Sequence, residues 1–285
     1  MTGTRVAVVG LGRLGTCLIR ALRRSGVDVR AIVSRQTDRV NRLTQSLELD
    51  PRILTPLGGV AAIADWVFLT VPDTELAFVT EQLALGPDQA LIHCSGALDL
   101  APLAAARNHG TSVGVFHPLQ SFGPDAPPER FAGVAVGVDA EGPLFDALFA
   151  LAERFGARPF SLRGIDRARY HAAAVFASNY LVALHAIAAR IWQSAGLPPD
   201  TARNALATLS RGAVENIEAH ELAVALTGPI ARGDALSVSR HLAALENDRL
   251  SLEIYRVLAC ELLQLPLNHS PEVRAALERV LEEPD

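Results

Sequence analysis

The stretch RVAVVGLGRLG, residues 5–15, decides the fold that we predict for this chain. Its first five residues are rich in valine and predict a short buried strand. Apolar residues then recur at helical spacing over residues 14–22, which predicts an amphipathic helix. Gly26 follows where a helix commonly ends in a left-handed glycine. The pattern Gly-x-Gly-x-x-Gly therefore stands between a strand and a helix, which is the setting of a dinucleotide-binding turn.

Each of the three glycines has a separate reason to be there. Gly10 permits the tight turn, Gly12 allows the backbone to approach a diphosphate, and Gly15 allows the helix to pack closely on the strand. The helix N-terminus then offers N–H groups and partial positive charge to the phosphates. The alternative is a glycine-rich turn that binds nothing. We predict that the whole turn contacts a cofactor: Gly10, Leu11, Gly12, Arg13, Leu14 and Gly15.

The composition favours an ordinary globular protein of one or two domains. The chain has 285 residues, of which 49% are hydrophobic, and a formal net charge of −5, so charge gives no reason to expect a nucleic-acid or membrane partner. The first strand begins at once, so we expect no targeting segment. The three cysteines lack metal-site or redox spacing, and we expect reduced core thiols in a cytoplasmic protein with no bound metal.

The end of the second predicted strand, residues 27–33, selects between the two nicotinamide dinucleotides. An NAD site commonly has an acidic residue near this point, and here the only candidate, Asp28, comes too early. Ser34 and Arg35 instead offer a hydroxyl and a guanidinium, which suit the 2′-phosphate of NADP. We therefore predict NADP, the alternative being that Arg35 is only a solvated loop residue. The next strand, residues 65–71, ends at Val71 and Pro72, which we also expect to contact the cofactor.

Two further strand ends carry polar residues that are candidates for chemistry. The strand at residues 90–92 leads to His93 and Ser95, and the strand at residues 112–116 leads to His117. The carboxyl ends of parallel strands open on one crevice, so we expect Ser95 and His117 to meet there. A neutral His117 could hydrogen-bond a substrate oxygen, and a charged one could protonate it. We interpret His93 as a packed strand residue instead.

The sheet is predicted to continue to residue 162, and the rest of the chain is predicted to be helical. Strands at residues 131–138 and 157–162, with a helix at 144–155 between them, would extend the sheet. We place the domain boundary after residue 163, which gives a dinucleotide-binding domain at 1–163 and a helical domain at 164–285. Helices are expected at residues 167–192, 199–217, 236–245, 249–263 and 271–282.

The helix expected at residues 167–192 is apolar nearly all round, so we predict that it is buried and does not cross a membrane. A helical domain with such a helix is expected to share its core with a second copy of the chain in a homodimer. The alternative is a self-contained bundle in a monomer. Polar residues on this helix need partners, and they include Tyr170, His171, Ser178 and Asn179.

Seen together, several stretches of the chain resemble a known family. They are residues 10–15, 93–96 and 116–122, Tyr170-His171 with Ser178-Asn179-Tyr180, and Leu226-Thr227-Gly228-Pro229. The family consists of NADP-dependent oxidoreductases that join a Rossmann-like domain to a helical domain of unknown function. The resemblance implies an α/β fold: a Rossmann-like doubly wound sheet followed by an all-helical C-terminal domain.

The wider relatives of that family imply roles for particular residues. In prephenate dehydrogenases a His-Pro after a strand carries the catalytic histidine, with a serine nearby, and His117 and Ser95 are similar in placement. Ketopantoate reductases and β-hydroxyacid dehydrogenases carry a Lys and an Asn one turn apart. Asn179 matches the Asn, but Val175 stands at the Lys position, so the usual ammonium acid is missing.

From these features we predict an NADP-dependent reductase that transfers a hydride to a small 2-oxo acid of the ketopantoate type. Ser95, His117 and Asn179 are the predicted catalytic residues, and substrate contacts are predicted for His171, Ser178 and Thr227. One alternative is reduction of a cyclic imine, as in pyrroline-5-carboxylate reductase, because a protonated imine needs less help from an acid. Another is a protein that binds NADP without turnover.

Overall fold

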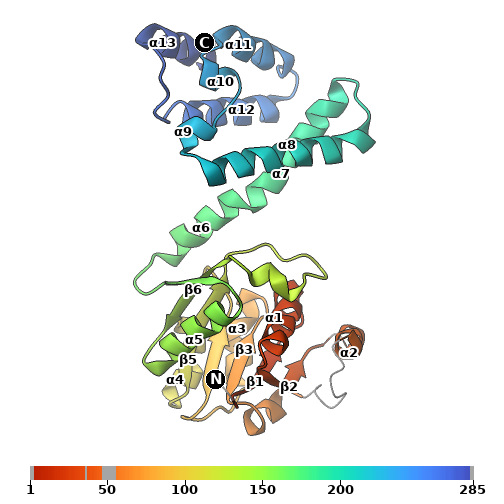
Figure 1. The fold of residues 1–285 in the computed structure, drawn as a ribbon, viewed down its shortest axis with the longest axis vertical. Helices are drawn as coiled ribbons and strands as arrows, with labels where there is room; N and C mark the ends of the chain where they lie inside the picture. The colour runs from red at the N-terminus through yellow and green to blue at the C-terminus, as the bar shows by residue number, and fades with distance from the viewer. Residues whose placement is uncertain (1–2, 36, 47–55, 283–285) are drawn as a thin grey trace. The chain divides into compact units, whose positions relative to one another are not determined.

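The computed structural model describes residues 3–35, 37–46 and 56–282, and it divides the chain into two compact units, Met1–Asn179 and Tyr180–Asp285 (Figure 1). The sheet ends within the first unit at residue 161, and every later element is helical. The helix that follows the sheet, α6 (Arg167–Ala177), is part of the first unit by its contacts. The predicted domain boundary after residue 163 therefore coincides with the end of the sheet, and as a boundary between domains it stays a prediction.

The first unit is built on a seven-stranded sheet of order β2-β1-β3-β4-β5-β6-β7. Strands β1 to β5 are parallel, β6 runs antiparallel to β5, and β7 is parallel to β6. This order, with β1 in the interior and β2 and β3 on its two sides, confirms the predicted doubly wound sheet. The strands are β1 (Arg5–Val9), β2 (Asp28–Val33), β3 (Trp66–Leu69), β4 (Ala90–His93), β5 (Ser112–Pro118), β6 (Ala135–Ala140) and β7 (Arg158–Ser161).

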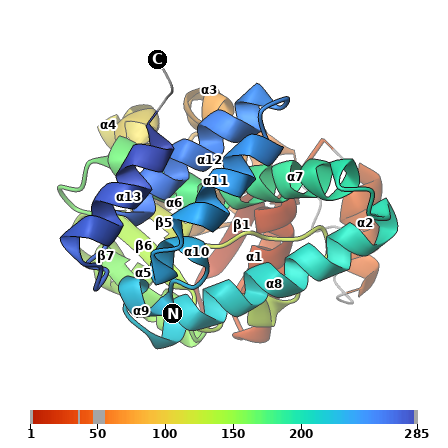
Figure 2. The ribbon, with the colours of Figure 1, turned by 90° about the horizontal axis from the view of Figure 1, so that it is seen from above.

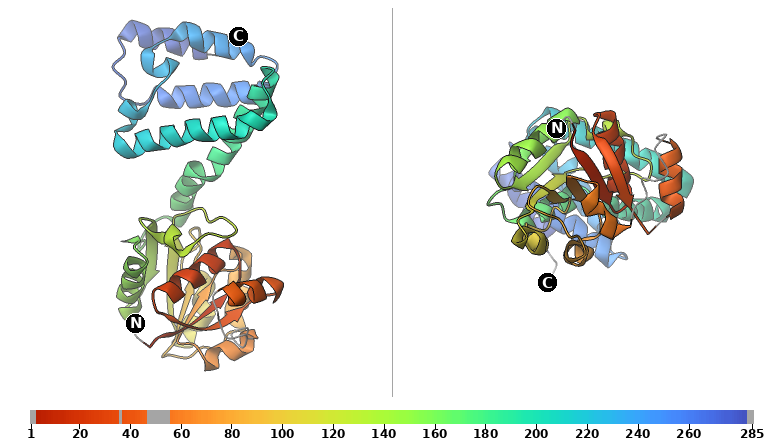
Figure 3. Two further views of the ribbon diagram at one scale, coloured as in Figure 1. Left: turned by 45° about the vertical axis from the view of Figure 1, so that its right-hand side comes forward. Right: turned by 90° about the horizontal axis from the view of Figure 1, so that it is seen from below.

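Helices cover both faces of this sheet (Figures 1 and 3). One core joins alternate residues of the strands, such as Val6 and Val8, to α1 (Arg13–Arg24) and α5 (Pro143–Arg154). The other joins the intervening residues, such as Ala7 and Val9, to helices on the opposite face. That face carries η2 (Leu57–Ala62), η3 (Asp73–Glu75), α3 (Leu76–Glu81), η4 (Ala101–Leu103) and α4 (Ala104–Asn108), and the unit also contains α2 (Thr37–Ser46) and η5 (Pro128–Phe131).

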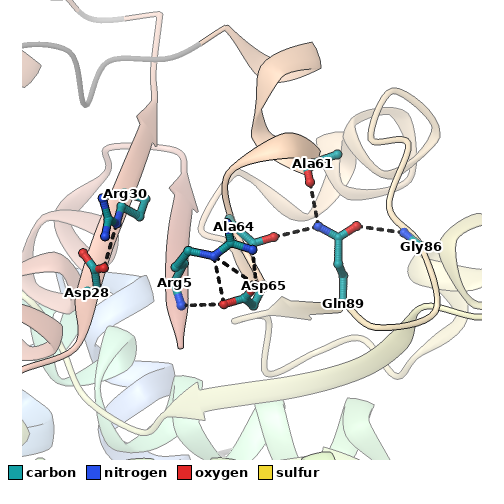
Figure 4. Close-up of polar contacts among 8 residues, drawn as sticks. All are labelled: Arg5, Asp28, Arg30, Ala61, Ala64, Asp65, Gly86 and Gln89. Atoms are coloured by element: carbon teal, nitrogen blue, oxygen red, sulfur yellow. Dashed lines mark hydrogen bonds and ion pairs between the residues drawn. The ribbon is translucent and has the colours of Figure 1, made fainter. Parts of the chain in front are cut away.

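Polar contacts fix the amino ends of the strands (Figure 4). The backbone N–H of Arg5 donates to Asp65 Oδ2 at 2.8 Å, and its guanidinium donates to Oδ1 at 2.5 Å. These bonds lower the pKa of the Asp65 carboxyl. Gln89 donates to the carbonyl of Ala64 at 2.6 Å and accepts from the N–H of Gly86 at 2.9 Å. Together these contacts hold β1, β3 and β4 in register at the end of the sheet opposite their carboxyl ends.

The second unit is entirely helical in the described residues, and its core is small. The buried residues come mainly from α11, α12 and α13, with Val238 and Leu277 fully buried. Helices α11 and α13 lie side by side (Figure 2). Asp234 accepts the N–H of Ser237 and so caps the start of α11. The helices are α7 (Asn179–Ser194), α8 (Pro199–Ala219), α9 (Leu222–Ala225), α10 (Pro229–Arg232), α11 (Ala235–Ala244), α12 (Arg249–Leu262) and α13 (Pro271–Leu281).

The single buried helix predicted at residues 167–192 is wrong in two respects. The helix is broken at Ser178, whose ψ of −65° comes with a φ of −123°, so α6 and α7 are separate helices. No residue of α7 is buried, because the helices of its own unit do not cover its apolar residues. By length and composition alone, residues 167–194 are together long and apolar enough to cross a membrane.

The prediction of three core thiols is wrong for one of them. Cys17 and Cys94 are buried, but Cys260 is exposed.

Candidate active site

The turn after β1 has the geometry that its glycines predict. Gly10 has a φ of +100°, and a Cβ there would lie 2.8 Å from the carbonyl carbon and oxygen of Thr70. A Cβ on Gly15 would lie 2.3 Å from the carbonyl oxygen of Gly10. By contrast, a Cβ on Gly12 would have one neighbour within 4 Å, the Thr70 oxygen at 3.9 Å. The turn is therefore closed against the protein at Gly10 and Gly15 and open at Gly12, which fits a ligand approaching its backbone.

A pocket of about 730 Å³ lies over this turn at the carboxyl ends of β1, β2 and β3. Helix α1 begins there with Gly12 as its N-cap and no side chain bonded to its first N–H groups, so these donors can serve an anionic ligand. Of the residues predicted to bind the cofactor, all except Gly15 line the pocket, since Gly15 is buried behind the turn. The pocket walls include Gly10, Leu11, Gly12, Arg13, Leu14, Ser34, Arg35, Val71 and Pro72.

The charged residues that bear on the choice between NAD and NADP lie near opposite ends of β2, and the choice of NADP stays a prediction. Arg35 is exposed and lines the pocket with Ser34. Asp28, the acidic residue of β2, lies at the start of that strand and accepts a bond from Arg30 at 2.7 Å (Figure 4). Its carboxylate is thus held away from the carboxyl ends of the strands, where a ribose would have to lie for Asp28 to bind its hydroxyls.

Ser95 and His93 follow β4 and are engaged with the protein itself. Ser95 is buried, and its Oγ donates to Asp73 Oδ2 at 2.7 Å and accepts the backbone N–H groups of Ala97 and Leu98. His93 is fully buried; its Nδ1 accepts the N–H of Ser95, and its Nε2 donates to a backbone carbonyl. Burial lowers the pKa of His93. His93 is therefore the packed strand residue that we predicted, and the structure adds that its ring is neutral at neutral pH. The hydroxyl of Ser95 already donates its proton to Asp73.

His117, near the end of β5, is half-buried and paired with a tyrosine. Its Nδ1 lies 2.7 Å from the hydroxyl of Tyr170, and the two rings meet edge to face with centroids 5.5 Å apart. Gly96 makes room for the imidazole, because a Cβ there would lie 2.6 Å from His117 Cε1 and 2.7 Å from Nε2. Burial, with smaller contributions from His171 and Arg167, lowers the pKa of His117 to about 4. The ring is consequently neutral at neutral pH, which excludes a resting imidazolium as the proton donor there.

A buried ion pair lies beside this histidine. Arg167, at the start of α6, donates from Nη2 to Asp139 Oδ2 at 2.6 Å, and both side chains are largely buried. In the pairing of β5 with β6, Asp139 stands opposite Val115 and His117 stands opposite Gly137, so both side chains project from one face of the sheet. Arg167 Nη1 and His171 Nδ1 are buried and have no partner among the described residues. The start of α6 thus places cationic and polar groups over the end of β5.

The remaining predicted site residues lie elsewhere. Ser178 and Asn179 are exposed at the junction of α6 and α7, and no hydrogen bond joins Asn179 to Ser95 or His117 in the described part of the chain. Val175, at the position of the expected lysine, is half-buried. Thr227 is exposed before α10 in the second unit. Roles in binding or catalysis for these residues stay predictions.

Sequence reasoning missed Tyr170, Arg167 and Asp139 as members of the site. Tyr170 was recognised as a polar residue that needed a partner, but nothing in the sequence indicates that this partner is His117. The buried pair of Arg167 and Asp139 depends on β6 running antiparallel to β5, which the spacing of the strands does not reveal. Within the ranges that the structure describes, no group of three or more His, Cys, Asp or Glu side chains is arranged to hold a metal ion.

Two family models match the chain. Residues 2–118 match a Rossmann-like domain, and residues 134–262 match a domain of unknown function, DUF2520. Together they confirm the resemblance that the sequence motifs indicated, a Rossmann-like domain followed by a helical domain of unknown function. No match to the chain exists among the curated proteins.

Solved structures of similar fold extend over nearly the whole chain. One from Bacteroides fragilis, provisionally named an NADP oxidoreductase, is 24% identical, with a TM-score of 0.75 over 91% of this chain and 97% of its own. A protein from Thermotoga maritima is 26% identical, with a TM-score of 0.70 over 96% and 98%. An imine reductase from Myxococcus stipitatus, solved in complex with NADP⁺, is 18% identical, with a TM-score of 0.62 over 98% and 100%. These likenesses support the two-unit fold.

Proposed function

We propose that this chain, which joins a Rossmann-like domain to a DUF2520 domain, is an NADP-dependent oxidoreductase that reduces a small 2-oxo acid. The observation that carries the proposal is the pocket at the N-terminus of α1. Its walls include the open backbone of Gly12 and the side chain of Arg35, which follows β2. The structures of similar fold that are named for NADP chemistry agree with it.

In this proposal the first unit holds the cofactor with groups of two kinds. The N–H groups that begin α1 would receive the diphosphate, and Ser34 and Arg35 would receive the 2′-phosphate. Val71 and Pro72 would support the part of the cofactor that leads toward the reacting end. A bound nicotinamide supplies the hydride, and the protein supplies position and charge.

His117 is the group best suited to the substrate oxygen. Its ring is neutral, its Nδ1 is bonded to Tyr170, and among the described residues its Nε2 has no hydrogen-bond partner. Ser95 would act through Asp73, which it holds by a 2.7 Å bond, because its own hydroxyl proton is already donated. Asn179, His171, Ser178 and Thr227 remain proposed substrate contacts, with Asn179 orienting the carbonyl.

A second candidate is the reduction of a cyclic imine. Val175 at the expected lysine position and the low pKa of His117 both leave the site without a strong acid at neutral pH. A protonated imine brings its own proton, so it needs less acid help than a ketone. The similar fold of an imine reductase solved with NADP⁺ favours including this class.

We also propose that the chain works as a homodimer in the cytoplasm. The apolar residues of α7 are exposed in the single chain, with Val182 at 71%, and a second copy would cover them. Packing against a second helical unit would return α7 to the buried state that its sequence predicts.

NADPH oxidation tests the proposed function directly, with 2-oxo acids, aldehydes and cyclic imines as substrates and NADH run in parallel. We expect NADPH to be preferred and one carbonyl or imine class to be turned over. His117→Ala should lower kcat for that substrate by about 10²–10⁴-fold. Tight NADPH binding with no turnover of any class would indicate a non-catalytic NADP-binding protein, and an unchanged kcat in His117→Ala would remove His117 from the site.

A further inference from the structure

We propose that Tyr170 is a positioning residue for the reduction, and that its bond to His117 Nδ1 keeps the imidazole proton on Nε2, where it can be donated to the substrate. The inference rests on the proposed function and deepens it. Val175 stands where the resemblance leads us to expect a lysine, so a proton must reach the substrate from another group. The juxtaposition joins two elements far apart in the chain, the end of β5 and the first turn of α6.

The contacts around the Tyr170 ring hold its hydroxyl group beside His117 Nδ1. Its ring meets His117 edge to face at 5.5 Å and contacts the ring of Phe160 on β7 at 6.1 Å. With both sides of the phenol held, the hydroxyl lies 2.7 Å from His117 Nδ1, the normal length of a good O–H hydrogen bond. Gly96 leaves room for the imidazole, because a Cβ there would lie 2.6 Å from His117 Cε1. The hydrogen bond with Tyr170 is therefore the polar contact that orients the ring.

The direction of this bond follows from the chemistry of the two partners. A phenol is a stronger proton donor than a neutral imidazole N–H, and an imidazole nitrogen with a lone pair is the better acceptor. The hydroxyl of Tyr170 therefore donates to Nδ1, which requires the proton of the neutral ring to be on Nε2. Nε2–H is then the atom that can donate to a carbonyl oxygen or an imine.

Most of the groups that face the pair favour the neutral ring, and Asp73 alone among them acts in the opposite direction. The groups around it are Asp73 from η3, His93 from β4, and Arg167 and His171 from α6. Burial of His117 and the nearby Arg167 cation both oppose an imidazolium. The same cation acts on Tyr170 in the direction that lowers its pKa, against burial, which raises it. Negative charge developing on the phenol oxygen would thus be met by Arg167.

The step balances as a two-electron reduction. A reduced nicotinamide bound at the glycine turn would supply the hydride to the substrate carbon, and His117 Nε2 would give its proton to the substrate oxygen. As Nε2 loses its proton, Nδ1 takes the proton of Tyr170, so the imidazole stays neutral throughout. The phenolate that remains is stabilised by Arg167 and regains its proton from solvent. No charged imidazole is formed at any point.

The first test needs no substrate. In ¹⁵N-histidine-labelled wild-type protein, the NMR signals of His117 should show a proton on Nε2 and none on Nδ1 throughout pH 6–8, and Tyr170→Phe should shift the Nδ1 signal. A proton found on Nδ1 in the wild-type protein would overturn the inference, whatever the folding of any variant. His117→Asn identifies the signal by its disappearance.

The second test compares two variants that each remove one tyrosine hydroxyl. Tyr255 in the second unit bonds His241 Nδ1 at 2.9 Å with rings edge to face at 5.8 Å, which makes Tyr255→Phe a matched control. We expect Tyr170→Phe to lower kcat by about 10²-fold with little change in KM, and Tyr255→Phe to change neither. A lost bond that mattered only for folding would lower the melting temperature of both variants and leave kcat per folded molecule unchanged.

The outcomes separate this inference from the proposed function. Wild-type protein that reduces no substrate would contradict the proposed function, while the tautomer measurement would still decide the inference about Tyr170. Wild-type turnover with an equal kcat in Tyr170→Phe would overturn the inference and leave the oxidoreductase intact. For a substrate that carries its own proton, such as a protonated imine, the loss in Tyr170→Phe should be smaller than for a ketone.

Discussion

The two units of this chain differ in how far each completes its own core. The first unit buries the apolar side chains of its sheet against helices of the same unit on both faces. The second unit leaves large apolar side chains exposed on its longest helices, with Val182 of α7 at 71% and Leu209 of α8 at 72%. The first unit is therefore a self-contained scaffold for a site, whereas the second has an exposed apolar surface that we propose a second copy of the chain covers.

The largest expected effect comes from the turn that the first unit packs most tightly. Gly15→Ala would place a methyl 2.3 Å from the Gly10 carbonyl oxygen, and overpacking against backbone should cost about 3 kcal/mol. Gly12→Ala is the matched control, because its methyl meets no protein atom closer than 3.9 Å. Thermal unfolding should show destabilisation only for Gly15→Ala, and calorimetric titration should show weaker NADPH binding for both. A Gly12→Ala protein with full affinity would mean that no ligand approaches that backbone.

The next effect tests the exposed surface of the second unit. Val182→Glu places a charge on the apolar face of α7, and burying it unpaired in a dimer should raise the dimer dissociation constant at least about 100-fold. Arg279→Glu, an exposed change on α13, is the control and should leave the association unchanged. Sedimentation equilibrium measures both. Wild-type protein that is monomeric at all concentrations would show that the second unit needs no copy of itself, and binding of wild-type protein to lipid vesicles would identify a membrane instead.

A smaller effect concerns the choice of cofactor in the first unit. Arg35→Ala removes a guanidinium that lines the pocket, and a lost charge-assisted bond to the 2′-phosphate should raise the Kd for NADPH by about 10–100-fold. The Kd for NADH should stay the same, because NADH lacks that phosphate. Equal losses for both dinucleotides would show that Arg35 contributes in some other way than by contact with the 2′-phosphate.

The smallest effect is a dependence of stability on pH that the half-buried His117 should produce. Its pKa is about 4 in the folded chain and about 6.5 in an unfolded one, so its contribution is fully present above pH 6.5 and is lost as the pH falls toward 4. The loss should approach about 1.4 kcal/mol per pH unit. Urea unfolding at pH 7 and pH 5 should therefore show wild type losing about 2 kcal/mol more than His117→Asn. A parallel decline in the two proteins would mean that His117 titrates normally when folded.

The contrast between the units also separates what could be predicted from the sequence from what could not. Strong local signals, the valine runs and the Gly-x-Gly-x-x-Gly spacing, correctly predicted the strands and the turn at Gly10, and apolar periodicity correctly predicted helices α8, α11, α12 and α13. The break at Ser178 was not predicted, because apolar periodicity continues through it. The burial expected for α7 failed because periodicity indicates which residues need cover and does not indicate what provides it.

The candidate site divides in the same way. The residues of the glycine turn are adjacent in sequence, so their arrangement follows from a short motif. The pairing of His117 with Tyr170, and of Asp139 with Arg167, joins residues from separate elements and depends on the order and direction of β5, β6 and β7. One sequence without its fold could mark Tyr170 as a polar residue in need of a partner, but not identify the partner.

The central claim is that the first unit binds NADP at the turn after β1, and a crystal structure grown with excess NADP⁺ tests it most directly. We expect the diphosphate within hydrogen-bond distance of the N–H groups of residues 12–14, and the 2′-phosphate against Ser34 and Arg35. A structure at saturating NADP⁺ in which the turn holds no nucleotide, or in which Arg35 points away from the 2′-phosphate, would contradict it.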